Sequence, residues 1–332
     1  MPWWLLLLLL GWSAVPSFLL MGDRILDVRS HDVLRRLGVV YVIATAALIG
    51  ASAAVEPGYV ELVAWGALAG LLGTITLDIV RLIGLKLGAF PLDMPVVFGF
   101  MALGKTRMLQ ANVMGQVLRD AVDTGTIKEF VSERLTRIPH LPERQRVNAA
   151  AAIMGAIGTL DPATKEQVSE AQFAALGSLS APERQAVMAA MDAAVATSQP
   201  GQPRGLPRVR FQTFREAATR AFAVLDKTER RVMSQARLYG YIWHAVNGIS
   251  FGIGYTLIFG RGSVGWALAW GVFVWLAMMV AMPAMMPVLE LPNWFPIVPL
   301  AAHIAMVLPF FWLVGWVSDP AHQVSILGLL GG

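Results

Sequence analysis

The chain has 332 residues, of which 56% are hydrophobic and 14% are charged, and its mean hydropathy is +0.59. Soluble domains carry about 25% charged residues, so this chain has too few charges to cover a fully solvated surface. It also contains no cysteine, which excludes disulfide frameworks, thiolate metal sites and cysteine nucleophiles. The composition therefore predicts that much of the surface contacts lipid, where charges are costly.

The net charge of +4 is concentrated in the middle of the sequence. Residues 105–237 contain 19 basic and 13 acidic residues, whereas the rest of the chain contains 7 basic and 9 acidic residues. A basic segment next to membrane helices is typical of the cytoplasmic side, beside anionic lipid headgroups. No basic motif interleaved with aromatic residues is present, so nucleic acid is not an expected partner.

Hydrophobic runs predict three membrane spans within residues 1–104. The first run, 2–22, is similar to a signal peptide, but no Lys or Arg precedes it, which favours a retained helix. Two further runs, 37–55 and 59–86, flank an acidic turn. The segment 89–104 is short for a span and carries an aspartate, so it is predicted to be re-entrant or interfacial.

Residues 105–236 are predicted to form a water-soluble helical insert. Pro142, Pro162 and Pro182 are each 20 residues apart, and proline is tolerated in the first turn of a helix. Apolar residues recur at helical spacing after these prolines. The pattern predicts a small bundle of three alanine-rich helices, at about 142–157, 162–176 and 182–197.

Local signals mark the ends of the insert's helices. Ser180 and Glu183 match the capping-box pattern, and Asp161 is a suitable N-cap before the next proline. A Pro- and Gly-rich linker follows at 198–208. A basic helix at about 211–237 is then expected to lead into the membrane, with its arginines at the lipid headgroups.

Three more spans are predicted within residues 237–332, at 238–260, 265–289 and 296–317. The complete prediction is an all-α fold, a polytopic membrane helical bundle of about six spans with an inserted soluble helical domain. The excess of basic residues in the insert places it in the cytoplasm and both chain ends outside. Such a chain is expected to be a multi-pass protein of the bacterial inner membrane, with the lipid bilayer as one partner.

Four residues of the predicted spans are expected at one depth. Asp78 lies eight residues before Lys86, the cytoplasmic end of its span, and His244, His303 and Met282 lie seven residues from the same end of theirs. At 1.5 Å per residue, all four are roughly 10 Å from the cytoplasmic interface. Ionisable residues at such depth are rare and are candidates for function.

This layer has several interpretations. Two imidazoles, a carboxylate and a thioether can bind a metal ion such as copper, or pass protons, with Asn247 orienting His244. Two histidines on different helices can also ligate haem as a cofactor. Alternatively, the histidines bond to neighbouring helices and Asp78 pairs with Arg81, so that all serve packing. The methionines around Met282 are more typical of packing than of copper binding.

Particular residues of the two membrane halves carry a resemblance to other proteins. In the first half they are Gly70, Gly73, Thr74, Asp78, Leu92, Asp93, Met94, Pro95 and Gly99, and in the second half they are His244, Asn247, Gly248, Phe251, Gly252, Tyr255, Trp270, Gly271, Met282, Pro283 and His303. In these residues the chain resembles the uncharacterised bacterial inner-membrane proteins of the YagU-like type. The resemblance implies a compact helical membrane module and no known reaction. It does not extend to the insert at 105–236.

No H-E-x-x-H motif is present, and an enzyme is not the favoured class. The leading hypothesis is a non-enzymatic membrane subunit or accessory protein whose cytoplasmic insert, 105–236, docks a protein partner. The alternative is a transporter or carrier of metal ions or protons that uses the Asp/His/Met layer. A membrane enzyme acting on lipid or quinone is the third hypothesis.

Overall fold

The structure is a computed structural model. It describes residues 3–25, 30–106, 108–109, 112–113, 115–116, 124–158, 160, 162–196, 209–285 and 289–331. The described residues are predominantly helical, which confirms the predicted all-α class. They separate into two compact units. Unit 1 comprises Met1–Gly104, Ser234–Met285 and Asn293–Gly332, and unit 2 comprises Lys105–Met233 and Met286–Pro292.

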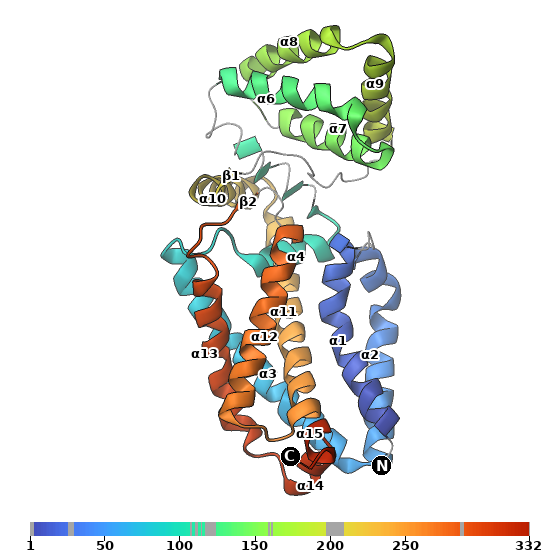
Figure 1. Cartoon of the computed structure of the whole chain (residues 1–332), viewed down its shortest axis with the longest axis vertical. Helices are drawn as coiled ribbons and strands as arrows, with labels where there is room; N and C mark the ends of the chain where they lie inside the picture. Colours follow the sequence, from blue (N-terminus) through green and yellow to red (C-terminus); the bar gives the residue numbers. More distant parts are fainter. Residues whose placement is uncertain are drawn as a thin grey trace. The chain divides into compact units, whose positions relative to one another are not determined.

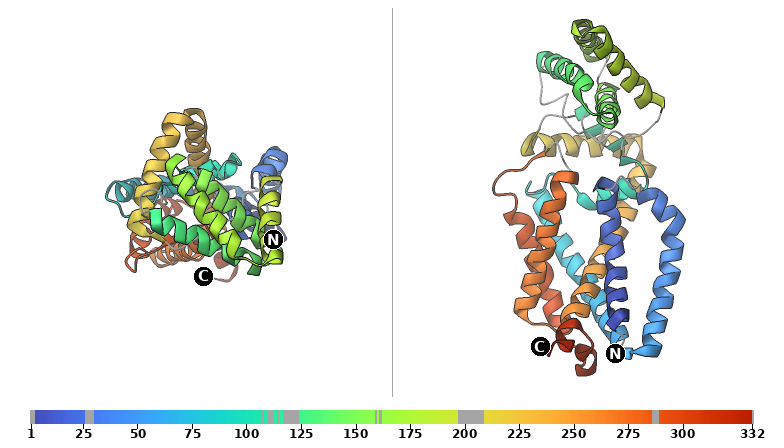
Figure 2. Two further views of the ribbon diagram at one scale, coloured as in Figure 1. Left: turned by 90° about the horizontal axis from the view of Figure 1, so that it is seen from above. Right: turned by 45° about the vertical axis from the view of Figure 1, so that its right-hand side comes forward.

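Six long helices of the described chain run lengthwise through unit 1 (Figures 1 and 2). They are α1 (Trp3–Ile25), α2 (Ser30–Val55), α3 (Pro57–Lys86), α11 (Arg230–Phe259, whose first residues belong to unit 2), α12 (Val264–Met285) and α13 (Ile297–Val314). Among the described residues, α2, α3, α11 and α13 are long and apolar enough to cross a membrane. The apolar parts of α1 and α12, Trp3–Leu19 and Val264–Val280, are shorter. Unit 1 is therefore a helical bundle compatible with a membrane protein.

Helix α2 shows most clearly how unit 1 meets its surroundings. Only 6% of the residues in its apolar window are buried, and side chains such as Val39, Val42 and Ile43 are mostly exposed. Exposing a continuous apolar helix to water is unfavourable, because each large aliphatic side chain forfeits about 1.5–3 kcal/mol of burial. A lipid environment removes that cost.

Close helix packing in unit 1 depends on glycine. On α3 and α11, a Cβ added to Gly252 would lie 2.0 Å from the carbonyl oxygen of Gly66, and one added to Gly70 would lie 2.1 Å from that of Gly248. Only residues without a side chain allow the two backbones to approach so closely. Gly66, Gly70, Gly248 and Gly252 therefore allow the close α3–α11 contact.

The segment 89–104 contains the short helix α4 (Met94–Ala102). Nine helical residues extend about 14 Å, less than half of the roughly 30 Å hydrocarbon thickness, so α4 does not span. It packs on the start of the unit 1 part of α11, where a Cβ on Gly99 would lie 1.7 Å from the Ala236 carbonyl oxygen. The short segment thus closes one end of unit 1.

Two further short helices, α14 (Asp319–Gln323) and α15 (Ile326–Leu329), lie at the opposite end of unit 1 (Figure 1). Glu61 of α3 accepts hydrogen bonds from the backbone N–H and the hydroxyl of Ser318, at 2.6 and 2.7 Å. Arg261 forms an ion pair with Asp319 at 2.6 Å and donates to the Val317 carbonyl. These contacts fix the α14 segment to the ends of α3 and α11.

Unit 2 contains α6 (Thr124–Arg137), the 3-10 helix η1 (Ile138–His140), α7 (Glu143–Gly158), α8 (Pro162–Ser178) and α9 (Ala181–Ala196). Helix α6 packs against α8, and α7 packs against α9. The three helices predicted from the proline spacing are confirmed as α7, α8 and α9, each within two residues of the expected bounds. Their small buried residues, such as Ala150, Ala175 and Ala190, permit this close packing.

The predicted capping box at the start of α9 is confirmed. The Glu183 carboxylate accepts from both the backbone N–H of Ser180, at 3.0 Å, and its hydroxyl, at 2.6 Å. Both hydrogen bonds hold the pKa of Glu183 below its ordinary value, and the one from the Ser180 hydroxyl has the larger effect. The other predicted cap, Asp161, lies outside the described residues.

The junction between the insert and the second group of long helices differs from the prediction. The single basic helix expected at 211–237 is broken at Glu229, whose φ of −130° and ψ of 43° are not helical. Helix α10 (Phe211–Thr228) lies before the break, and α11 begins at Arg230, eight residues before the predicted span. Helix α10 buries one apolar face within unit 2. If α10 and α11 formed one continuous helix, that face would not be buried there.

The fifth predicted span, 265–289, is also too long. Helix α12 ends at Met285, and Pro287 is unfavourable for continuing it, because proline lacks the N–H that a helix needs. Residues Leu289–Glu290 instead form the strand β2, which pairs in parallel with β1 (Val209–Arg210). This pairing joins segments 80 residues apart, and no sequence pattern indicated it.

Candidate functional site

Four polar side chains of unit 1 gather around the guanidinium group of Arg81. Arg81 Nε donates to Asp78 at 2.9 Å, and Nη1 donates to Asp93 at 2.7 Å. Arg81 Nη2 donates to the Tyr241 hydroxyl at 3.1 Å, and that hydroxyl donates to Asp93 at 3.3 Å. The Asp78 carboxylate also lies 3.2 Å from Nδ1 of His244. These five residues are named the Arg81 cluster.

Three helical elements position the cluster. Asp78 and Arg81 are three residues apart and share one face of α3, and Tyr241 and His244 have the same spacing on α11. Asp93 is the N-cap residue of α4, and its carboxylate turns to Arg81 and Tyr241 rather than to the helix it precedes. The cluster therefore ties α4 to α3 and α11.

The cluster is largely removed from solvent. The Arg81 side chain is 5% exposed, and those of Asp78, His244 and Asp93 are 17%, 18% and 21% exposed. Burying a charge costs several kcal/mol unless it is paired, and Arg81 offsets that cost by using three of its nitrogens. Its guanidinium carbon is also 5.6 Å from the Tyr241 ring centroid, within cation–π range.

The charges of the Arg81 cluster do not cancel. Asp78 and Asp93 contribute two formal negative charges and Arg81 contributes one positive charge, which leaves −1 when His244 is neutral. The imidazole of His244 lies beside Asp78, on the opposite helix. An unbalanced negative charge in a poorly solvated place attracts a cation.

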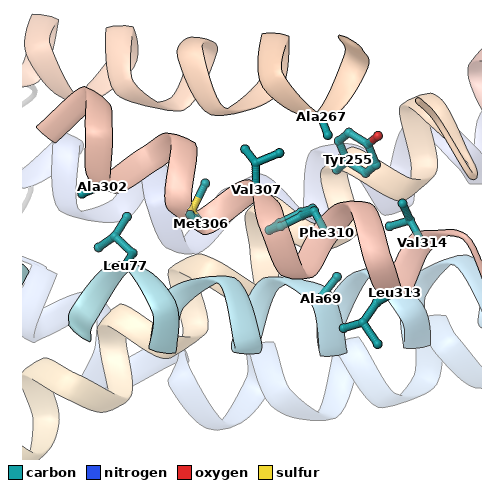
Figure 3. Packing of buried hydrophobic residues seen from close by; sticks show 10 residues of the cluster. All are labelled: Ala69, Leu77, Tyr255, Ala267, Ala302, Met306, Val307, Phe310, Leu313 and Val314. Carbon is teal, nitrogen blue, oxygen red and sulfur yellow. The ribbon is translucent and has the colours of Figure 1, made fainter. Parts of the chain in front are cut away.

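His303, the third ionisable residue of the predicted layer, lies at the same level as Asp78. Leu77 and Ala302, the residues just before them, belong to one buried cluster formed mainly by α3 and α13 and lie together at one end of it (Figure 3). His303 is 5% exposed. Its Nδ1 is 2.7 Å from the Pro299 carbonyl oxygen, which accepts a hydrogen bond from it.

Met282, the fourth predicted member, is buried in α12. Helix α12 meets the level of His303 at Gly271, where an added Cβ would lie 3.1 Å from the His303 carbonyl oxygen. From Gly271 to Met282 is eleven residues, which is about 16 Å along a helix. The equal-depth argument overlooked this offset because it assumed that α12 continued to residue 289.

The structure brings Asp78 and His244 together. It also confirms the pairing of Asp78 with Arg81, which was expected if these residues serve packing. Asn247 accepts a hydrogen bond from Ser17 of α1 at 3.4 Å, rather than orienting His244. Within the described ranges, no group of three or more histidine, aspartate or glutamate residues is placed to hold a metal ion. Metal, proton and haem binding at the layer stay predictions.

Two residues of the site escaped sequence reasoning. Tyr241 was missed, although its spacing of three residues from His244 places both on one helix face. No sequence pattern singled out His31, which lies in α2 and whose Nδ1 donates to the Ala102 carbonyl at 2.7 Å. It thereby joins α2 to the end of α4.

A G-x-G-x-x-G pattern at 260–265 was also overlooked. Gly260 and Gly262 both have φ of +61° and form the tight turn between α11 and α12. A dinucleotide-binding pattern follows a strand and opens a helix, whereas this one joins two helices. The pattern therefore serves the turn.

Comparisons with protein-family models, with curated proteins and with solved structures found no match to this chain. The resemblance to the YagU-like proteins thus stays a prediction, and function is argued from the geometry alone.

Proposed function

We propose that this chain is a non-enzymatic, multi-pass accessory protein of the bacterial inner membrane that binds a protein partner through unit 2. The six long helices of unit 1 are the proposed spans. Although the apolar parts of α1 and α12 are short, these helices have 23 and 22 residues, or about 33–35 Å, which is sufficient for a hydrocarbon core of roughly 30 Å.

The charge distribution supports an orientation with unit 2 in the cytoplasm. Residues 30–36, Lys86 and α4 lie at one end of unit 1, where His31 contacts Ala102. Glu56 and Glu61 lie at the opposite end. Basic residues accumulate at the cytoplasmic ends of spans, and unit 2 follows directly from the basic end.

Reporter fusions test this orientation. The proposed chain starts outside, and three spans precede Pro200, so a reporter attached after Pro200 is expected to read cytoplasm. Six spans precede Gly332, so a reporter attached there is expected to read exterior. Paired reporters, one active only in the cytoplasm and one only outside, make each position its own control. An exterior signal at Pro200 would invert unit 2 and exclude a cytoplasmic partner.

The observation that carries the partner proposal is the exposure of large apolar side chains on unit 2. Phe173 of α8 is 75% exposed, and Met188 and Val195 of α9 are 45% and 69% exposed. Met188 and Val195 are seven residues apart and therefore share one face of α9. Glu166 and Glu170 are exposed on α8 near Phe173, which suits a partner with an apolar patch bordered by basic side chains.

Phe173→Ser is expected to weaken partner binding at least tenfold, since aromatic anchors commonly contribute about 2 kcal/mol or more at an interface. The measurement is photo-crosslinking from a probe at Val195 in native membranes, followed by co-purification after mild detergent extraction. Gln167→Ser, an exposed polar position on the same helix, is the matched control and should change nothing. A chain that runs alone after extraction, with no crosslinked protein, would overturn the proposal.

A cation carrier is the second candidate function, favoured by the unbalanced negative charge of the Arg81 cluster and by the imidazole of His244 at its edge. Paired groups of this kind inside a membrane mark ion pathways in many transport proteins.

A further inference from the structure

Helix α2 lies at the edge of unit 1, and most of its surface is left uncovered by the rest of that unit (Figures 1 and 2). Only 6% of its apolar window is buried. Its exposed aliphatic side chains follow one another along the helix: Val39, Val40, Val42 and Ile43 are each at least 58% exposed. The molecule that covers this face must therefore be apolar over most of its length, as the acyl chains of a phospholipid are.

The charged residues of α2 are gathered at the level where the hydrocarbon core ends. They are Asp32, Arg35 and Arg36, and the residues after them, 37–55, are uncharged. Both arginines are exposed and Asp32 is half-buried. The 19 residues of the uncharged stretch extend about 28 Å, close to the roughly 30 Å of a hydrocarbon core. The two arginines thus lie where the phosphates of the adjoining lipids are expected.

Each arginine is in line with exposed aliphatic side chains. On a helix, residues three, four and seven positions apart share one face. Arg35 therefore shares a face with Val39 and Val42. Arg36 shares the adjoining face with Val40 and Ile43 in the same way. A phosphate held by both arginines would place the two acyl chains of its lipid along these aliphatic lines.

Asp32 lies beyond the arginines, on the side away from the aliphatic lines. It precedes Arg35 and Arg36 by three and four residues, so it shares their side of the helix and lies about 4.5–6 Å farther from the hydrocarbon core. A carboxylate has about four acceptor positions, so Asp32 can accept from a ligand in addition to bonds within the chain. The hydrogen bond from His31 to the Ala102 carbonyl fixes this turn of α2 in unit 1.

We propose that Asp32, Arg35 and Arg36 bind the headgroup of a phospholipid that carries a primary ammonium, such as phosphatidylethanolamine. Along α2 the order is carboxylate, arginines and aliphatic side chains, and along this lipid it is ammonium, phosphate and acyl chains. The arginines donate to the phosphate and Asp32 accepts from the ammonium, so every bond is charge-assisted. In the proposed orientation, the lipid belongs to the cytoplasmic leaflet.

Two other common headgroups match this face less well. Phosphatidylglycerol offers a phosphate to the arginines but no cation to Asp32. Phosphatidylcholine offers a cation, but its quaternary ammonium has no N–H to donate to the carboxylate. A preference for the primary ammonium therefore distinguishes this site from the general attraction of basic residues to an anionic membrane surface.

Native mass spectrometry of the purified full chain, titrated in mild detergent with each of the three lipids, tests the proposal. The wild type is expected to retain phosphatidylethanolamine more strongly than the other two. Asp32→Asn should weaken that binding roughly fivefold and leave phosphatidylglycerol binding unchanged or stronger, whereas Arg35→Gln with Arg36→Gln should weaken both at least as much. Glu143→Gln, at an exposed acidic residue of unit 2, is the control and should keep the wild-type pattern.

A variant with the order of charges reversed, Asp32→Arg with Arg36→Asp, separates the arrangement of the charges from their sum. It keeps the net charge but should lose the preference for phosphatidylethanolamine. Melting curves without added lipid show whether each variant is folded. Equal retention of the three lipids by the wild type, or an unchanged preference in a folded Asp32→Asn or order-reversed variant, would overturn the inference. Partner binding by unit 2 would be unaffected, because Phe173 and Val195 lie in the other unit.

Discussion

Replacing Arg81 by glutamine is expected to destabilise unit 1 by about 3–5 kcal/mol, because it leaves two buried carboxylates without their shared cation. Asp78 and Asp93 both depend on Arg81, at 2.9 and 2.7 Å, and Tyr241 loses its charged partner as well. Helix α4 should detach first, since Asp93 is its N-cap residue. Thermal melting in mild detergent, followed by tryptophan fluorescence, measures the loss.

A charge-compensated variant separates ion pairing from packing. If unpaired carboxylates cause the loss, then Arg81→Gln combined with Asp78→Asn and Asp93→Asn should be more stable than Arg81→Gln alone. Arg231→Gln, at an exposed arginine of α11, should melt as the wild type does. A compensated variant no more stable than the single one would show that the pairing contributes little.

The sequence predicted those parts of the fold that local physics determines. Long apolar runs located the helices of unit 1, and prolines with a capping box located α8 and α9 in unit 2. These signals lie within a few residues of the structure they specify. The break at Glu229 was missed because it accompanies the burial of the apolar face of α10, and that burial is a tertiary effect.

The candidate site was predictable only in part for the same reason. The pair Asp78 and Arg81 is local to one helix turn and was anticipated. The contacts of Arg81 with Asp93 and Tyr241 join residues 12 and 160 positions away, and only the packing of α4 and α11 on α3 brings them together. Equal depth indicated that Asp78 and His244 could meet, but not which faces of their helices do so.

The second large effect is expected at the α3–α11 contact. Gly252→Ala should destabilise unit 1 by about 3 kcal/mol, at the upper end of typical overpacking costs. The new methyl group would lie 2.0 Å from the Gly66 carbonyl oxygen and 2.7 Å from the Gly70 backbone, and neither can rotate away as a side chain can. The two helices must therefore separate, which also draws His244 away from Asp78.

Gly254→Ala is the matched control, two residues away on the same helix. Its added Cβ meets the Trp270 ring at 3.5 Å, an ordinary contact, and replacing a helical glycine by alanine gains up to about 1 kcal/mol in helix propensity. Melting of both variants in one detergent gives the comparison. Gly254→Ala should melt at or above the wild-type temperature and Gly252→Ala well below it. Equal melting temperatures would mean that the backbones of α3 and α11 are not in close contact.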